Sequence, residues 1–223
     1  MSRFRSIAAV SVVLLICAAA HANSTELLTF EGLKDLSSVG NFYNGSGPNG
    51  TPNYGVSFSQ NFYGITSFMN GGVGDFTPSP LGTPAIFLNG PTGAAVTGTM
   101  NVTSGFTGGI NFFYTAGFAP GQMETVTIWS GAGGTGTVLA TINLGNNNAS
   151  CTSLAYCTWT LAGASFSGTA KSVTFTGPAN ELGLAMITLG QSTTAIPEPA
   201  SVLLLGTGIA GAAFTRIRRR LGL

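Results

Sequence analysis

Hydrophobic residues recur at every second position in short segments along most of the chain. In residues 124–129, Val126 and Ile128 alternate with polar threonines, as in a strand with one buried face. Glycine, proline and asparagine separate these segments, and no helical period joins them. Ten strands are therefore predicted, at residues 27–30, 54–58, 85–88, 95–102, 109–114, 124–129, 138–144, 158–161, 171–176 and 182–189. Many short strands favour an all-β fold, a β-sandwich of the jelly-roll type.

Two long segments between these strands, residues 42–54 and 70–84, are rich in Gly, Asn and Pro. Loops of this length at the rim of a sandwich form binding surfaces or flexible covers. A shorter segment places Gly131, Gly133 and Gly136 in the spacing G-x-G-x-x-G. Because a strand and not a helix is predicted after it, we interpret this motif as a hairpin loop and not as a nucleotide site.

The amino terminus has the pattern of a secretory signal peptide. Two arginines precede the apolar residues 7–20, and Ala20 and Ala22 are small residues at the two positions that signal peptidase reads. Cleavage by signal peptidase is predicted after Ala22, so that the mature chain begins at Asn23. The alternative is a lipoprotein attached through Cys17, but the residue before this cysteine is larger than such processing normally accepts.

The carboxyl terminus combines three features in a fixed order. A rigid elbow is followed by the apolar residues 200–214 and then by a basic cluster. The elbow is Pro197, Glu198 and Pro199, and the cluster is Arg216, Arg218, Arg219 and Arg220. A helix over the apolar run would be about 22 Å long, short of the roughly 30 Å hydrocarbon core. The arginines act as a membrane stop on the cytoplasmic side and leave the preceding chain outside. A plain tail anchor is the alternative.

This tail resembles the PEP-CTERM sorting signal of bacterial proteins that exosortases process. The resemblance implies that an exosortase cleaves at or near Pro197, Glu198 and Pro199, after a transient stay in the inner membrane. The chain would then consist of a signal peptide (1–22), a β-sandwich ectodomain (23–190), a linker (191–196) and the sorting signal with its transmembrane helix (197–223). The protein would reach the cell surface or the extracellular space.

The composition of the ectodomain excludes several classes of function. Between residues 23 and 196 there are two lysines and six acidic residues, a net charge of −4, and the single histidine of the chain, His21, lies in the signal peptide. A nucleic-acid partner requires a basic surface, so none is expected. Histidine-dependent catalysis and histidine-ligated metals are excluded as well. We predict a protein that is not an enzyme and uses no cofactor.

The body of the chain also resembles an ectodomain that recurs among PEP-CTERM proteins. Segments such as residues 29–33, 52–58 and 105–109 carry this resemblance. In similar jelly rolls a late acidic residue joins an early glutamate in a calcium site, whereas this chain has Ala185 and Met186 at the late position. No metal site is therefore predicted, and Glu31, with Asp75 or Glu181, is the one calcium candidate.

Three further residue sets have alternative interpretations. Glu31 and Asp35 have the two carboxylates that a glycosidase needs, but they also fit solvated loop charges. Trp129 and Trp159 fit either sugar stacking or ordinary packing.

The third set is Cys151 and Cys157, the pair that survives processing. A disulfide is predicted, because exported proteins meet oxidising conditions. A redox site is the alternative, although the pair lacks a CxxC spacing.

From these observations we expect an exported, non-enzymatic β-sandwich with a structural or adhesive role in biofilm or floc. Its expected partners are signal peptidase, an exosortase and the inner membrane. A carbohydrate-binding module for matrix exopolysaccharide is the second hypothesis, and a matrix glycoside hydrolase is the third.

Overall fold

The computed structural model describes residues 25–191, which form ten strands and one short 3-10 helix. The strands are β1 (Glu26–Leu28), β2 (Ser37–Ser38), β3 (Val56–Phe58), β4 (Phe62–Ile65), β5 (Ala85–Leu88), β6 (Ala95–Ala116), β7 (Glu124–Trp129), β8 (Val138–Leu144), β9 (Thr160–Pro178) and β10 (Leu182–Leu189), and the helix η1 is Phe68–Asn70. The all-β prediction is confirmed. Within residues 25–191 no helix has the length and apolar character needed to cross a membrane.

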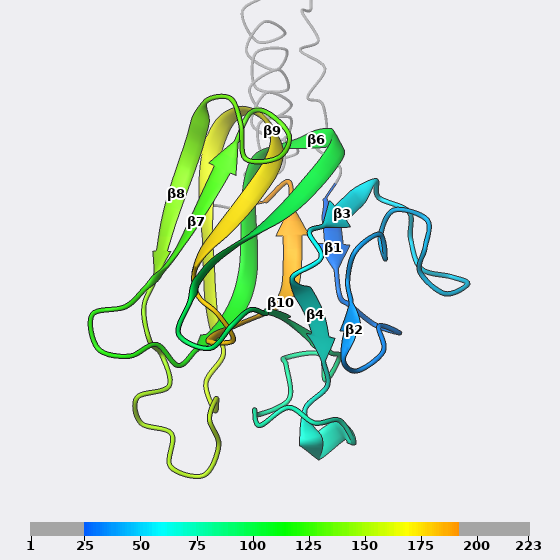
Figure 1. The fold of residues 1–223 in the computed structure, drawn as a ribbon. Helices are drawn as coiled ribbons and strands as arrows, with labels where there is room; N and C mark the ends of the chain where they lie inside the picture. Colours follow the sequence, from blue (N-terminus) through cyan, green and yellow to red (C-terminus); the bar gives the residue numbers. More distant parts are fainter. Residues whose placement is uncertain (1–24, 192–223) are drawn as a thin grey trace, which may run out of the picture.

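All strand pairs are antiparallel, and two long strands connect two layers (Figure 1). The first layer has the order β2-β4-β5-β10, followed by the second half of β6 and the first half of β9, with β1 also on β10. The second layer has the order β3, the first half of β6, the second half of β9, then β7 and β8. The two layers therefore share β6 and β9 and pack face to face.

The sequence predicted two separate strands within β6 and two within β9, but each of these is one continuous strand. Where the sequence predicted a break, the strand bends, with register shifts between Asn101 and Phe106 and between Thr107 and Gly108. Gly105 has φ +76°, and a β-carbon there would collide with Thr169 and the Ala170 carbonyl. Glycine allows both the positive φ and the close approach, so the chain bends without leaving the sheet.

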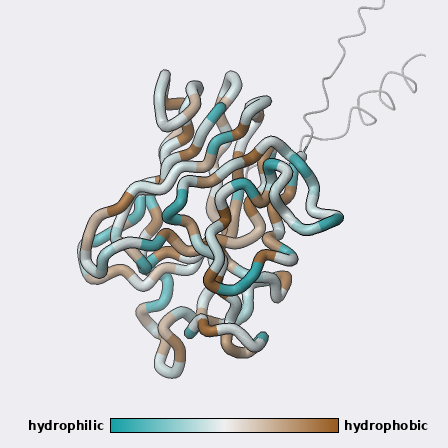
Figure 2. Tube along the Cα trace, turned by 45° about the vertical axis from the view of Figure 1, so that its right-hand side comes forward, coloured by the Kyte–Doolittle hydropathy of each residue, from teal (hydrophilic) through white to brown (hydrophobic). Residues whose placement is uncertain are grey.

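Aromatic rings join the two layers across the core. Phe62 of β4 and Phe112 of β6 both meet Phe175 of β9, with ring centroids 5.6 and 6.1 Å apart, and all three are fully buried. Figure 2 shows short hydrophobic stretches alternating with hydrophilic ones throughout the fold, as the sequence pattern requires. The alternation thus places one face of most strands in a common core.

A second, smaller cluster packs outside the main core. Phe76, Ala85 and Phe87 are buried there against Tyr156 and Trp159. The last two residues lie in or next to the loop that a disulfide between Cys151 and Cys157 closes, with Cα atoms 5.7 Å apart. The predicted disulfide is confirmed.

The structure contains two strands, β2 and β4, that were not predicted from the sequence. Gly64 weakens the strand signal of β4, yet Phe62 pairs with Leu88 and Ile65 with Ala85 on β5. Gly64 is needed because a side chain there would overlap Leu33. The predicted strand at residues 54–58 is shortened to β3, and the one predicted at 27–30 is shifted to β1, which begins one residue earlier and ends two residues earlier.

Candidate functional site

Tyr54, just before β3, lines two hollows of the surface. Its half-buried ring stacks on Tyr43, with centroids 5.9 Å apart and planes 24° apart. The Tyr43 hydroxyl accepts a hydrogen bond of 2.6 Å from the Phe30 backbone N–H, and burial raises the pKa of this hydroxyl. Tyr54 is therefore supported from behind by a fixed aromatic ring.

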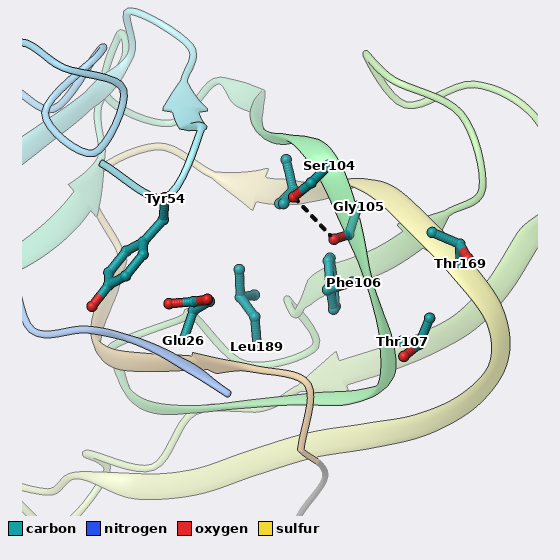
Figure 3. Close-up of a pocket in the computed structure, with 9 residues that line it drawn as sticks. Glu26, Tyr54, Ser104, Gly105, Phe106, Thr107, Thr169 and Leu189 are labelled. Carbon is teal, nitrogen blue, oxygen red and sulfur yellow. Dashed lines mark hydrogen bonds between the residues drawn. The ribbon is translucent and has the colours of Figure 1, made fainter. Parts of the chain in front are cut away.

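The first hollow has a volume of about 250 Å³ and lies between β1 and the bend of β6 (Figure 3). Its lining is Glu26, Tyr54, Val102, Ser104, Gly105, Phe106, Thr107, Thr169 and Leu189. Figure 3 shows the Glu26 carboxylate next to Tyr54, with Thr169 on the opposite side. The Ser104 hydroxyl donates to the Gly105 carbonyl at 3.3 Å. The hollow thus combines an aromatic ring, a carboxylate and hydroxyl groups.

The second hollow is more open, with a volume of about 630 Å³. Tyr54 and Tyr43 line it on one side, together with Leu27, Thr29, Glu31, Gly32 and the loop residues 48–52. A neighbouring hollow of about 550 Å³ lies between the turns around Leu33 and Phe42. The segment 42–54 contributes to both, so one of the two long loops lines binding-sized hollows.

The acidic residues that sequence analysis singled out occupy separate places. Both carboxylate oxygens of Asp35 accept backbone hydrogen bonds, from Thr66 N–H at 2.8 Å and Val73 N–H at 3.1 Å. Asp35 therefore holds two loops together, whereas Glu31 is exposed at the Tyr54 hollow. This arrangement gives Asp35 a structural role and does not support a glycosidase pair.

The residues considered for calcium binding do not form one cluster either. Asp75 accepts a hydrogen bond from the Ala155 N–H at 3.1 Å, and Glu181 accepts one from the Tyr156 hydroxyl at 3.4 Å. Burial, followed by the charges of Glu181 and Asp75, raises the pKa of Tyr156. In residues 25–191 no three His, Cys, Asp or Glu side chains lie together as a metal site requires.

Glu124 is a feature that the strand pattern did not reveal. Its side chain is fully buried at the start of β7, and neither carboxylate oxygen has a hydrogen-bond partner among the described residues. Burial raises its pKa to about 8. The alternation of β7 could have indicated this burial, because Glu124 shares the face of Val126 and Ile128.

The two tryptophans have different positions. Trp159 packs on Phe76 in the second cluster and donates to the Thr77 carbonyl at 2.8 Å. Trp129 lies half-buried on the outer face of the second layer, and its indole N–H donates to the Thr174 hydroxyl at 2.9 Å. Both indole N–H groups are thus engaged within the chain, and Trp129 is the one that lies on the outer face of the second layer.

The glycine motif after β7 is part of a hairpin. The Gly131 N–H donates to the Thr135 carbonyl at 2.9 Å, and the Ser130 N–H to the Thr137 carbonyl at 3.0 Å. The segment joins β7 to β8, two paired strands, and no helix begins after it. The hairpin interpretation is confirmed.

Comparison with protein families identifies the end of the chain. Residues 195–220 match the model of the PEP-CTERM protein-sorting motif. The carboxyl terminus carries a PEP-CTERM sorting motif. The motif indicates exosortase-targeted export to the cell surface. Residues predicted for processing lie outside the described residues: Ala20, Ala22, Asn23, Pro197, Glu198, Pro199, Arg216, Arg218, Arg219 and Arg220.

No curated protein matches the chain. Among solved structures, it is similar to the K1 cleaved adhesin domain of Lys-gingipain from Porphyromonas gingivalis W83, with 10% identity, a TM-score of 0.44, and 76% of this chain and 99% of that chain covered. It is similar to a family 29 carbohydrate-binding module, with 12% identity, a TM-score of 0.39, and 80% and 97% covered. It is also similar to the carbohydrate-binding module of Cellvibrio mixtus lichenase 5A in complex with cellotriose, with 12% identity, a TM-score of 0.33, and 75% and 97% covered. At these TM-scores no ligand or residue role is carried over to this chain.

Proposed function

We propose that this protein is an exported, non-enzymatic surface protein with a structural or adhesive role in the extracellular matrix of a biofilm or floc. The observation that carries the proposal is the match of residues 195–220 to a sorting motif at the end of the chain. The domain order is then signal peptide (1–22), ectodomain (23–190), linker (191–196) and sorting signal (197–223). In this scheme the apolar residues 200–214 hold the protein in the inner membrane until the exosortase acts.

The experiment that tests sorting is mass spectrometry of the carboxyl terminus. We expect a shortened chain, cut near Pro197, in cells that contain an exosortase, and a chain ending at Leu223 in cells that lack it. If the chain ends at Leu223 in both, sorting is replaced by a simple tail anchor. Attachment of cells to a surface, compared between strains with and without the gene for this protein, then tests the adhesive role.

A hydrolase is disfavoured by the position of the acidic residues. Asp35 is engaged by two backbone N–H groups and is not available as a partner for Glu31. An activity screen on matrix polysaccharides tests this class with the wild type and the Glu31→Gln and Glu124→Gln variants. A hydrolytic activity of the wild type that either variant loses would support the hydrolase hypothesis.

Carbohydrate binding is a second candidate function, favoured by the hollows on both sides of Tyr54. An aromatic ring with adjacent carboxylates and hydroxyls is a combination that can stack on and hydrogen-bond to a sugar. A glycan array with the wild-type chain and the Tyr54→Ala variant tests this candidate. Tyr63→Ala is the matched control, because Tyr63 is a half-buried tyrosine of β4 that does not line the Tyr54 hollows.

A further inference from the structure

The outer face of the second layer carries an ordered array of threonines, which we call the threonine grid. Cross-strand pairing through β6, β9, β7 and β8 defines two rows. The first row is Thr97, Thr176, Thr125 and Asn143, and the second is Thr99, Thr174, Thr127 and Thr141. The residues between them on the strands, such as Phe175 and Val126, are buried. The grid therefore points away from the core.

The second row has hydroxyl groups that are free to bind. The hydroxyls of Thr99, Thr127 and Thr141 make no hydrogen bond to any part of the chain between residues 25 and 191. The Thr174 hydroxyl accepts from Trp129 and keeps its own proton to donate. In the first row, by contrast, the hydroxyls of Thr97 and Thr176 lie 2.9 Å apart and share one hydrogen bond, and the Thr125 hydroxyl donates to the Asn143 side chain at 3.4 Å.

The glycine hairpin closes one side of the grid. The Gly133 N–H donates to the Asn101 side chain at 2.7 Å, and the Gly134 N–H donates to the Ser172 hydroxyl at 2.9 Å. Asn101 and Ser172 form the row after Thr99 and Thr174, so the hairpin occupies that row. Gly134 also lies against the Thr174 methyl group, so the hairpin reaches the second row at β9. The strip that remains open consists of the two rows of the grid, with Gly134 and Trp129 at its border.

The spacing of the grid suits a chain of repeating units. Adjacent strands are about 4.8 Å apart, and alternate residues on one strand are about 6.7 Å apart. A row thus presents one hydroxyl at each of four strands, at intervals close to the length of one sugar in an extended glycan. The sheet twists, so a flat crystalline ligand could not match the hydroxyls of all four strands. A single polysaccharide chain can follow the twist.

The charge of the surface selects a neutral ligand. Neither row contains a charged residue, and residues 25–191 contain two lysines and six acidic residues. A polyanion would therefore be repelled and would find no cation to pair with on the grid. Threonine methyl groups and the indole of Trp129 provide apolar contact for the faces of sugar rings.

We propose that the threonine grid binds a neutral, extended polysaccharide that lies across the strands along Thr99, Thr174, Thr127 and Thr141, with one sugar at each strand. The inference rests on the proposed matrix role and names the surface and the class of ligand for it. Its test is separate from the test of sorting, because binding is measured on purified protein and does not depend on exosortase processing.

The key variant replaces Thr99, Thr127 and Thr141 together by valine, which removes three hydroxyls but keeps the shape and the strand preference of the side chains. The matched control replaces three exposed threonines outside the grid, Thr92, Thr103 and Thr152, by valine. Folding of both variants is compared by circular dichroism. Full-length protein in detergent is then titrated with hydroxyethyl cellulose, cello-oligosaccharides of two to six sugars, and alginate.

We expect binding to the neutral glucan that persists in 1 M salt, gains affinity up to four sugars, and exceeds binding to alginate. The grid variant should bind about 100-fold more weakly, because each of three hydrogen bonds is worth roughly a factor of five. The control variant should bind like the wild type.

Three results would overturn the proposal. One is a grid variant that binds as tightly as the wild type while Tyr54→Ala loses binding, which would move the site to the hollows. Another is a preference for alginate. The third is the absence of binding to the neutral glucans, which would leave the sorting proposal intact if the carboxyl terminus is still processed.

Discussion

Glu124 of β7 buries its carboxyl group against Gly177 of β9, in the space where any other residue would place its β-carbon. Both carboxylate oxygens lack a hydrogen-bond partner among the described residues. A charged carboxylate in such a place is costly, because burial removes its hydration without replacing it. The glycine is therefore required by the glutamate, and the glutamate favours its neutral form.

The stability of the protein should depend on pH through Glu124. Burial raises the pKa of this carboxyl from 4.5 to about 8 in the folded state. The folded state binds the Glu124 proton more tightly than the unfolded state does. The stabilisation from this proton is therefore complete below pH 4.5 and is lost as the pH rises to about 8. The free energy of unfolding should fall by on the order of 4 kcal/mol over this window. Urea unfolding at pH 5 and pH 8 measures the difference.

The Glu124→Gln variant should lose most of this pH dependence, because glutamine has the shape of the protonated acid and does not ionise. Glu31→Gln is the matched control, since Glu31 is exposed. It should keep the pH profile of the wild type. Equal pH profiles for the wild type and Glu124→Gln would contradict the assignment of the effect to Glu124.

The disulfide should stabilise the second aromatic cluster more than the main core. The bridged loop holds the 66–84 segment through the Tyr156 N–H to the Asp75 carbonyl at 3.2 Å and the Thr77 N–H to the Tyr156 carbonyl at 2.9 Å. Replacing Cys151 and Cys157 by serine should cost about 2 kcal/mol, the value for so short a loop. Limited proteolysis should then cut first between residues 66 and 84.

Ser153→Ala is the control for this experiment, because it changes an exposed residue within the same loop and leaves the bridge in place. Its digestion pattern should match that of the wild type. Unchanged protection of residues 66–84 in the serine variant would mean that the loop is held without the disulfide.

The bend of β6 should depend on Gly105. Gly93 has almost the same dihedral, φ +78° against φ +76° for Gly105, but a β-carbon at Gly93 would meet no atom within 4 Å. Gly93→Ala therefore reports the cost of the dihedral alone, about 1 kcal/mol. Gly105→Ala adds the collision with Thr169 and Ala170 and should cost a further 1–3 kcal/mol or so. Denaturant unfolding of the two variants measures this difference, and equal losses would argue against a packing role at the bend.

The mature amino terminus should be Asn23. Small residues at Ala20 and Ala22 predict cleavage directly before Asn23. Amino-terminal sequencing of exported protein gives the answer. Ala22→Tyr should block cleavage, whereas Asn23→Gln should leave it in place. A mature protein that begins at Met1 would rule out export by this route.

Replacement of Pro197, Glu198 and Pro199 by alanine should trap the full-length chain in the inner membrane. These residues lie outside the apolar run, so insertion needs only the hydrophobic length and the positive flank. Alanine at Ser192, Thr193 and Thr194 is the control and should leave processing unchanged. Immunoblots of membrane and medium fractions show the outcome, and release of the triple variant into the medium would argue against recognition of the elbow.

The sequence alone determined the features that depend on local patterns. Alternation at Val126 and Ile128 indicated strands, because one face of a strand is buried and the other is not. The order of Pro197, the apolar run and the arginines indicated the sorting motif, because such signals are read as linear segments. Cys151 and Cys157 are the two cysteines outside the predicted signal peptide, so the sequence predicted that they pair, and the structure confirms the disulfide.

The tertiary structure decided everything that depends on register between distant strands. Sequence patterns show that Thr99, Thr127 and Thr174 lie on exposed faces, but only the pairing of β6, β9 and β7 brings them into one row. Residues 62–65 form strand β4 because they pair with β5, although Gly64 lowers the strand propensity of this segment. The burial of Glu124 likewise depends on Gly177, a neighbour supplied by another strand. Such relations have no local signature, because folding selects them through the packing of the whole sheet.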